Sequence, residues 1–292
     1  MKRYFPPSEL LIEPNGAIYH LGVKPEQLAD KVILVGDPNR VPKVAAFFDT
    51  QECDVGAREF RTITGTYKGK RISVVGTGIG CDNIDIVVNE LDALANIDFA
   101  TRYEKEQFRP LEMVRIGTCG GLQEYTPIGS FICSVKSVGF DGLLNFYAGR
   151  NEVCDLPMER ALLNHLGWSG NMCQPAPYVI SADGELVERI AKGDMVRGVT
   201  VACGGFFGPQ GRRLRVPLAD PHQNEKVESF LYEGQQITNF EMESSALAGL
   251  AALMGHQAVT VCLVIANRRA KEANVDYNEK MKELIKTVLE RI

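Results

Sequence analysis

A nearly unbroken apolar run at residues 259–266 constrains the fold of this chain more than any other stretch. Strands buried on both faces read as continuous apolar runs, whereas strands with one exposed face alternate apolar and polar residues. A helical pattern through Leu247, Leu250 and Met254 precedes the run, and another follows it at about residues 277–291. We therefore expect a central strand in a sheet that carries helices on both faces.

Shorter apolar or alternating runs predict the other strands of this sheet. They lie at residues 31–35, 58–67, 71–75, 129–135, 178–181, 199–202 and 237–240, and at the start of residues 111–122. Helices are expected from about residue 82 and at residues 99–110, 156–166 and 183–192, and a loop at residues 141–151. Because no repeat, linker or low-complexity segment divides the chain, we expect a single α/β domain over residues 1–292 with a mixed central sheet.

The composition argues against several classes of function. The net charge of −5 comes from acidic and basic residues mixed along the chain, which is not the pattern of a nucleic-acid or membrane-surface protein. No apolar run approaches the roughly 20 residues that span a bilayer, and the N-terminus lacks a signal-peptide core. The eight cysteines form no Cys-x-x-Cys pair, and the four histidines show no metal-ligand spacing. We expect a cytoplasmic protein with reduced cysteines and no metal, nucleic-acid or membrane partner.

Arg40 follows the first predicted strand, just after the sequence Gly36-Asp37-Pro38 and inside the next predicted helix. Glycine lets a backbone approach a ligand closely, and the amides of a helix N-terminus favour an anion. From these residues alone, an anion site and a tight turn that happens to contain an arginine are equally open.

Arg115 interrupts an apolar strand immediately before the glycine-rich sequence Gly117-Thr118-Cys119-Gly120. An arginine cannot lose its charge, so its burial requires an anionic partner close by. The Thr118 hydroxyl and the amides of the glycines suit phosphate oxygens. This pattern favours a functional anion site over a structural role.

The glycine loop at residues 76–80 invites a dinucleotide-binding interpretation, because a strand precedes it and a helix follows it. Its spacing is G-x-G-x-G, however, and the two strands before it form a hairpin through residues 68–70, which does not open a βαβ unit. The sequence therefore argues against a nicotinamide cofactor.

Residues 203–213 form an irregular loop that carries Phe206, Gln210 and Arg212. An aromatic ring, an amide and a guanidinium can together stack on a planar heterocycle and hydrogen-bond to it. A loop rich in glycine and proline is otherwise a surface turn, and both interpretations stay open at this point.

Glu241, Met242 and Glu243 lie where a short strand gives way to a helix. Two carboxylates at a buried strand end need partners, and a ligand rich in hydroxyl groups supplies them. The alternative is a helix start, where acidic residues complement the helix dipole. On a regular helix the two side chains would point to different sides, so that one carboxylate could bind the hydroxyl-rich ligand and the other could face an arginine.

The motifs Arg115-Ile-Gly-Thr118, Phe206-x-Gly-Pro-Gln-Gly-Arg212 and Glu241-Met-Glu-Ser occur in an order that resembles the nucleoside phosphorylase family, and within it the uridine phosphorylase branch. The resemblance covers nearly the whole chain and implies a three-layer α-β-α sandwich around a distorted mixed β-sheet. It implies a pentosyltransferase of pyrimidine salvage that cleaves uridine, and also deoxyuridine, reversibly with phosphate. The alternatives on this fold are a purine nucleoside phosphorylase, a nucleoside hydrolase and a non-catalytic nucleoside-binding protein.

The resemblance also assigns residues to a phosphate site. Gly36 and Arg40 resemble the first phosphate contact, and Arg115 and Thr118 lie opposite them. Arg58 resembles an arginine that the family supplies to the same phosphate from a neighbouring subunit.

Ribose contacts are assigned in the same way. Met242 and Glu243 correspond to the ribose-binding pair, and Glu241 lies beside them. His20, which by itself reads as a structural histidine, resembles a second cross-subunit residue that contacts the ribose 5′-hydroxyl. These assignments imply a homodimer as the smallest catalytic unit, with a hexamer as a further option.

Phe206, Gln210 and Arg212 correspond to the uracil pocket, together with Gly120. Purine-specific bacterial relatives use an aspartate after the last strand to help protonate the purine ring. The matching residue here is Asn267, which cannot act as that acid.

The implied reaction needs no metal and no organic cofactor, because phosphate is a co-substrate. Some bacterial members of the family hold a potassium ion. The closest arrangement here involves Glu59 and Ile79, and Asn83 replaces the serine found at the third position.

Overall fold

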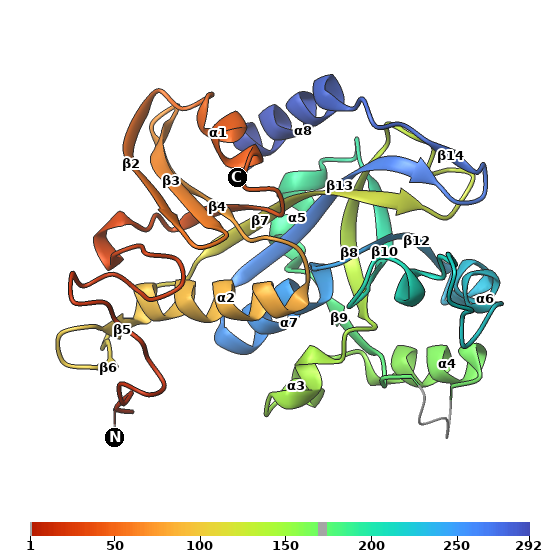
Figure 1. The fold of residues 1–292 in the computed structure, drawn as a ribbon, viewed down its shortest axis with the longest axis horizontal. Coiled ribbons are helices and arrows are strands. Elements are labelled where there is room, and N and C mark those ends of the chain that lie inside the picture. The colour runs from red at the N-terminus through yellow and green to blue at the C-terminus, as the bar shows by residue number, and fades with distance from the viewer. Residues whose placement is uncertain (1, 169–173) are drawn as a thin grey trace.

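The computed structural model of the protein describes residues 2–168 and 174–292 (Figure 1). A twelve-stranded mixed sheet is made of β1 (Lys31–Val35), β2 (Thr50–Ala57), β3 (Phe60–Tyr67), β4 (Lys70–Gly76), β7 (Glu112–Gly121), β8 (Phe131–Gly139), β9 (Tyr178–Ser181), β10 (Val196–Ala202), β11 (Leu231–Tyr232), β12 (Gln235–Glu241), β13 (Gln257–Asn267) and β14 (Glu272–Ala273). The strand order is β11-β12-β10-β8-β13-β7-β1-β4-β3-β2, while β9 pairs with β8 and β14 with β13.

β13 lies at the centre of the sheet, parallel to β7 on one side and antiparallel to β8 on the other. This confirms the prediction of a central strand at residues 259–266. The sheet is distorted, because β12 pairs with β10 and also, through Asn239 and Phe240, with Gly121 and Gly120 of β7. The strands β12, β10, β8, β13 and β7 therefore close into a ring, and the remaining strands extend from it.

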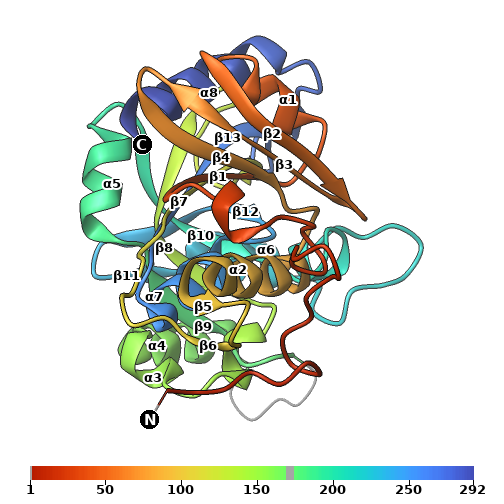
Figure 2. The same cartoon turned by 90° about the vertical axis from the view of Figure 1, so that its left-hand side faces the viewer.

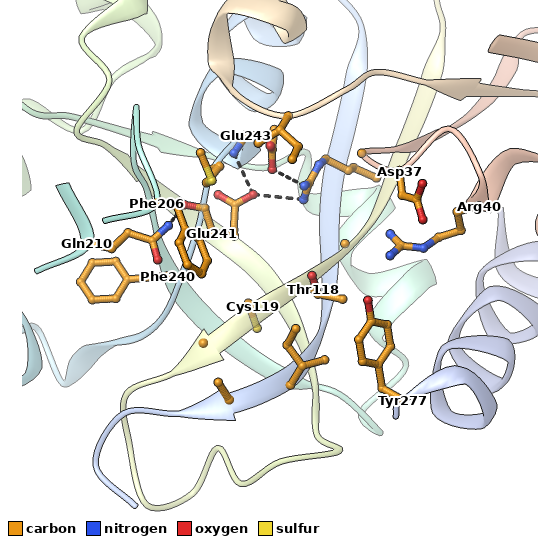
Figure 3. Close-up of a pocket in the computed structure, with 18 of the residues that line it drawn as sticks. Asp37, Arg40, Thr118, Cys119, Phe206, Gln210, Phe240, Glu241, Glu243 and Tyr277 are labelled. Atoms are coloured by element: carbon orange, nitrogen blue, oxygen red, sulfur yellow. Dashed lines mark hydrogen bonds and ion pairs between the residues drawn. The ribbon is translucent and has the colours of Figure 1, made fainter. Parts of the chain in front are cut away.

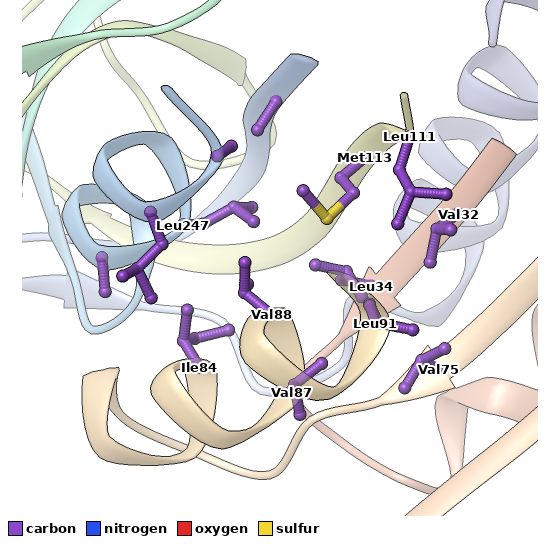
Figure 4. Close-up of a cluster of buried hydrophobic side chains, with 14 of the residues drawn as sticks. Val32, Leu34, Val75, Ile84, Val87, Val88, Leu91, Leu111, Met113 and Leu247 are labelled. Carbon is purple, nitrogen blue, oxygen red and sulfur yellow. The ribbon is translucent and has the colours of Figure 1, made fainter. Parts of the chain in front are cut away.

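Helices cover both faces of the sheet, as the sequence predicts (Figures 1 and 2). One face carries α1 (Arg40–Ala45), α5 (Gly184–Ala191) and α8 (Asn278–Arg291), and the other carries α2 (Cys81–Asn96) and α7 (Ser244–Met254). Alternate residues of β1 serve the two cores. Ile33 and Val35 pack with α1, α5 and α8, whereas Val32 and Leu34 pack with α2 and α7 (Figure 4). The fold is the expected three-layer α-β-α sandwich around a distorted mixed sheet.

Capping residues fix where several predicted helices begin. α4 (Leu156–Leu166) starts after Asp155, whose carboxylate accepts a hydrogen bond from the Met158 amide at 3.1 Å. α5 starts after Asp183, whose carboxylate accepts from the Leu186 amide at 2.8 Å. Such caps satisfy amides that have no partner within the helix.

In the described part of the chain, no helix combines the length and the apolar character that a membrane crossing requires.

The predicted helix at residues 99–110 is wrong. The chain there forms a small ribbon of β5 (Ile97–Asp98) and β6 (Tyr103–Glu104), followed by an extended connection. Asp98 explains the difference, because its carboxylate accepts hydrogen bonds from the Ala100 amide and the Thr101 hydroxyl, both at 2.9 Å. Local contacts of this kind compete with helix formation.

Four other elements also differ from the sequence predictions. The expected loop at residues 141–151 contains two helical turns, η2 (Leu143–Phe146) and α3 (Arg150–Val153). β2 and α6 (Gln223–Ser229) had no counterpart among the predicted elements. β2 is an edge strand that alternates between exposed and half-buried residues, so it offers no apolar run to detect.

Of the eight cysteines, seven are free thiols and Cys173 lies outside the described residues.

Candidate active site

A cavity of about 1010 Å³ lies at the carboxyl ends of β1, β7, β12 and β13 (Figure 3). Ligands of open α/β sheets bind outside these strand ends. Eleven of the thirteen predicted site residues line it, namely Gly36, Arg40, Arg115, Thr118, Gly120, Phe206, Gln210, Arg212, Glu241, Met242 and Glu243. The structure therefore brings together residues that lie far apart in the sequence.

The chemical groups around the cavity follow one another in a fixed order. They run from Arg40, Asp37 and Tyr277 at one end, past Glu241 and Glu243, to Phe206, Gln210 and Phe240 at the other end (Figure 3). A basic end, an acidic middle and an aromatic end thus share one space.

Arg40 dominates the basic end. It is the first residue of α1, is 7% exposed, and donates a hydrogen bond to the Ile116 carbonyl at 3.2 Å. Burial lowers the pKa of its guanidinium, because taking a positive charge out of water is costly. Within the described residues no carboxylate forms an ion pair with Arg40. The charge is therefore open to an anion in the cavity.

Gly36 and Thr118 stand beside Arg40. A Cβ atom at Gly36 would lie 3.3 Å from the Gly78 carbonyl oxygen, so the backbone approaches closely where the first predicted anion contact lies. Thr118 projects its side chain into the same end of the cavity (Figure 3). All three residues could contact one anion.

Arg115 lies between two buried carboxylates. Its Nη1 donates to Glu241 Oε2 at 3.0 Å, and its Nη2 donates to Glu243. Burial opposes the charge on Arg115, but the two carboxylates outweigh it and raise the pKa of the guanidinium. Gly117 leaves room for this arrangement, since a Cβ atom there would lie 2.5 Å from Nη1 of Arg115. Carboxylates thus supply the expected anionic partner, and a phosphate contact of Arg115 stays a prediction.

Glu241 is almost saturated with hydrogen bonds from the protein itself. Besides Arg115, its carboxylate accepts from the amides of Glu243 and Ser244, both at 2.9 Å, and from the Ser244 hydroxyl at 2.7 Å. These bonds leave Glu241 little capacity for a ligand. The arrangement assigns it mainly to holding the other site residues.

Glu243 has fewer partners. Its second oxygen accepts a hydrogen bond from the Gly80 amide at 2.7 Å. Burial raises the pKa of Glu243, Arg115 opposes the rise, and Glu241 adds to it. The expectation that the two glutamates point to different sides is wrong, because Glu241 ends β12 and Glu243 precedes α7. Neither lies inside a regular helix, and both reach Arg115.

The three predicted base-binding side chains meet at the aromatic end. The guanidinium of Arg212 lies 3.7 Å from the ring centroid of Phe206 and donates to the Phe206 carbonyl at 2.7 Å and to the Gln210 side-chain oxygen. Burial, together with repulsion from Arg268, lowers the pKa of Arg212 to about 10. The Phe206 ring, the Gln210 amide and the Arg212 guanidinium therefore form one wall of the cavity.

Arg268 is a neighbour of this wall that the sequence analysis did not single out. It donates to the Gln210 carbonyl at 2.7 Å and lies 5.8 Å from the ring centroid of Phe240. Arg269, the next residue, forms instead an exposed ion pair with Glu124 at 3.0 Å. Nothing in the sequence distinguishes these two adjacent arginines, so only the fold reveals which one supports the loop.

Gly120 and Met242 complete the wall. Gly120 pairs with Phe240 where β7 meets β12, and a Cβ atom there would have just the Ala266 carbonyl oxygen near it, at 3.9 Å. The Met242 carbonyl accepts a hydrogen bond from the Cys81 thiol at 3.1 Å, which fixes the backbone between the two glutamates.

Arg58 and His20 do not line the cavity. Arg58 lies in the turn between β2 and β3, with its guanidinium 4.6 Å from the ring centroid of Tyr19. His20 contacts the same Tyr19 ring edge-on, and its Nδ1 lies 2.6 Å from Glu90 Oε1. These are the two residues that the family resemblance attributes to a neighbouring subunit.

Asn267 also lies outside the cavity. Its side-chain amide donates to the carbonyls of Gln123 at 3.1 Å and Thr126 at 2.9 Å, and its oxygen accepts from the Ala270 amide. Asn267 thus holds loop backbone in place and supplies no acid to a base.

The three positions of the possible potassium site do line the cavity. Asn83, however, donates its side-chain amide to the Ile79 carbonyl at 3.2 Å. The residue that replaces the serine thus donates to one of the two lone pairs of this carbonyl oxygen. A potassium ion at Glu59, Ile79 and Asn83 stays a prediction that this contact makes less favourable.

Comparisons with known proteins agree with this architecture. A uridine phosphorylase from Thermococcus kodakarensis is 32% identical over 267 residues, which are 88% of this chain and 80% of the relative. A DeoD-type purine nucleoside phosphorylase from Oceanobacillus iheyensis is 26% identical over 279 residues, covering 92% of this chain and 98% of the relative. The solved structure of a Trypanosoma brucei nucleoside phosphorylase, described as showing uridine phosphorylase activity, matches with a TM-score of 0.88 and 28% identity, covering 97% of this chain and 98% of that one.

The sequence profile of the phosphorylase superfamily matches residues 30–292, which is most of the chain. The fold matches that of the solved nucleoside phosphorylase over nearly the whole chain. The chain belongs to the phosphorylase superfamily.

Proposed function

We propose that the protein is a uridine phosphorylase, which converts uridine or deoxyuridine and phosphate reversibly into uracil and ribose 1-phosphate or its deoxy form. The order of groups along the cavity carries this proposal. Arg40, which has no carboxylate partner among the described residues, suits the phosphate. Glu243 comes next along the cavity and suits the sugar, and Phe206 with its neighbours suits the base. The uridine phosphorylase among the relatives and the activity of the matched structure support it.

The proposed chemistry uses this order directly. A phosphate oxygen attacks C1′ of the ribose while the bond from C1′ to the uracil nitrogen breaks, and the bonding electron pair passes to the uracil ring. Arg40 holds the phosphate in line with the bond that breaks, and this orientation accelerates the reaction. Arg212 and Gln210 face the leaving base, where hydrogen-bond donors stabilise the negative charge that develops in the transition state.

The base end favours a pyrimidine over a purine. Gln210 and Arg212 match the carbonyls and N–H of uracil, which can accept and donate hydrogen bonds at one edge. Asn267 is held by backbone carbonyls and lies outside the cavity, so it offers no acid to protonate a purine ring. Purine phosphorylases are nevertheless among the relatives, and purine cleavage is the second candidate.

The proposal includes a homodimer, with a hexamer as a larger alternative, acting in pyrimidine salvage in the cytoplasm. Its support is the position of Arg58 and His20 outside the cavity of their own chain, where Arg58 is exposed and His20 contacts Glu90. Phosphate is the co-substrate, and the proposed steps use no metal or organic cofactor.

The decisive experiment measures uracil release from uridine with and without inorganic phosphate. Phosphate-dependent release with formation of ribose 1-phosphate is expected. Equal release without phosphate would identify a nucleoside hydrolase, and much faster cleavage of inosine or adenosine would identify a purine phosphorylase. Tight uridine binding without turnover at saturating phosphate would identify a non-catalytic nucleoside-binding protein.

A further inference from the structure

A tyrosine that the sequence analysis did not single out stands at the basic end of the cavity. Tyr277 immediately precedes α8 and lines the cavity together with Arg40 and Thr118. Figure 3 shows its hydroxyl pointing into the space between those two side chains. Tyr277 thus faces the proposed phosphate position from the connection between β14 and α8.

The hydroxyl of Tyr277 is unpaired in the described part of the chain. Other tyrosines with buried rings do not show this. The Tyr67 hydroxyl donates to Glu290 at 2.6 Å, and the Tyr178 hydroxyl donates to Asp141 at 2.9 Å. The ring of Tyr277 is half-buried and packs against the core formed with α1, α5 and α8. The ring is therefore anchored, while the polar tip faces the cavity.

Tyr277 and Arg40 are close enough to affect one another electrostatically. Burial lowers the pKa of Arg40. A neutral phenol and a guanidinium both donate hydrogen bonds, so they do not satisfy each other when the phenol acts as a donor. Two donors that converge on one space call for an acceptor, and an anion is the strongest one.

We infer that Tyr277 binds the phosphate co-substrate, with its hydroxyl donating a hydrogen bond to a phosphate oxygen that Arg40 and Thr118 also hold. The inference rests on the proposed function and adds Tyr277 to the residues that bind phosphate. Arg115 is occupied by Glu241 and Glu243 in this structure, so the basic end needs donors beyond Arg40. In the reverse reaction the same contact serves the phosphate group of ribose 1-phosphate.

Tyr277→Phe tests the inference, because it keeps the packed ring and removes the hydroxyl. The first readout is the Kd for inorganic phosphate alone, measured by isothermal titration calorimetry. A hydrogen bond to a charged group accounts for an increase in Kd of about tenfold. The second readout is kinetic: the KM for phosphate should rise by a similar factor, while the KM for uridine and the melting temperature stay unchanged. Tyr125→Phe is the matched control, since that exposed tyrosine lies outside the cavity.

The two readouts separate this inference from the proposed function. If the wild-type protein binds phosphate but does not cleave uridine, the proposed function fails, and weaker phosphate binding by Tyr277→Phe still supports the contact. An unchanged Kd for phosphate in the variant overturns the inference, as does the absence of phosphate binding by the wild type. An equal rise in both KM values also overturns it, because that result shows a general loosening of the cavity.

Discussion

Nη1 of Arg115 lies 3.0 Å from Oε2 of Glu241, and the two side chains are 5% and 1% exposed. Glu243 contacts the other nitrogen of the same guanidinium, so one buried cation serves two buried carboxylates. Such a cluster is not by itself a source of stability, because removing three charges from water offsets their attraction. Each charge nevertheless depends on the others once it is buried.

Arg115→Met should therefore destabilise the fold strongly. The substitution leaves two carboxylates buried without a cation, and breaking a buried pair costs about 3–5 kcal/mol. Urea unfolding monitored by fluorescence or circular dichroism measures the change. Arg61→Met is the control, because its ion pair with Asp54 is exposed and should contribute less than about 1 kcal/mol. Similar losses in the two variants would contradict a special role for the buried cluster.

The stability of the protein should depend on the ionisation of Glu243. Burial raises the pKa of this carboxyl, with Arg115 opposing and Glu241 reinforcing the rise. A group whose pKa is raised in the fold contributes stability that is fully present below its unfolded pKa, about 4.3 for glutamate, and is lost as the pH rises through the folded pKa. Glu243→Gln cannot ionise and has no such loss.

The free energy of unfolding of Glu243→Gln, relative to the wild type, should consequently shift in favour of the variant as the pH rises above about 4.3. Urea titrations of both proteins at a series of pH values measure this difference. A shift in favour of the wild type over the same range would mean that Arg115 lowers the pKa of Glu243 more than burial raises it.

The central strand could be predicted from the sequence, whereas only some of the site residues could. Burial on both faces leaves a continuous apolar signature, so β13 could be placed in the centre of the sheet from sequence. Arg115 stood out because a charge inside an apolar strand needs an explanation. Tyr277 and Arg268 could not be found, because the connection after β13 has no periodicity and their roles depend on which wall they reach. An arginine partner for Glu241 was among the sequence expectations, but the contact of both glutamates with the same Arg115 depends on where β12 ends.

Arg212→Ala should reduce kcat/KM for uridine by about 10²–10³, the range found when one donor to a developing negative charge is removed. Arg212 stacks on Phe206 and contacts Gln210, so the loss removes the cation from the base end without touching Arg40. Steady-state assays of uracil formation measure the effect. Arg213→Ala is the matched control, because Arg213 is exposed and lies outside the cavity. Near-normal activity of Arg212→Ala would refute the assignment of the base pocket.

A mixing experiment can decide whether Arg58 acts in the site of a partner subunit. Arg58→Ala and Arg40→Ala should each be nearly inactive, because each loses one proposed phosphate ligand from every site. In a dimer that combines the two variants, one of the two sites regains both arginines if Arg58 crosses the interface. Random reassociation should then restore about a quarter of the wild-type activity, because half of the dimers are mixed and half of their sites are complete. A mixture of the Arg58→Ala and Tyr125→Phe proteins is the control for mixing. Its activity should equal the fraction of subunits that keep Arg58, whether or not Arg58 crosses the interface. If the Arg58→Ala and Arg40→Ala mixture shows no more activity than the average of its two components, Arg58 does not act across the interface.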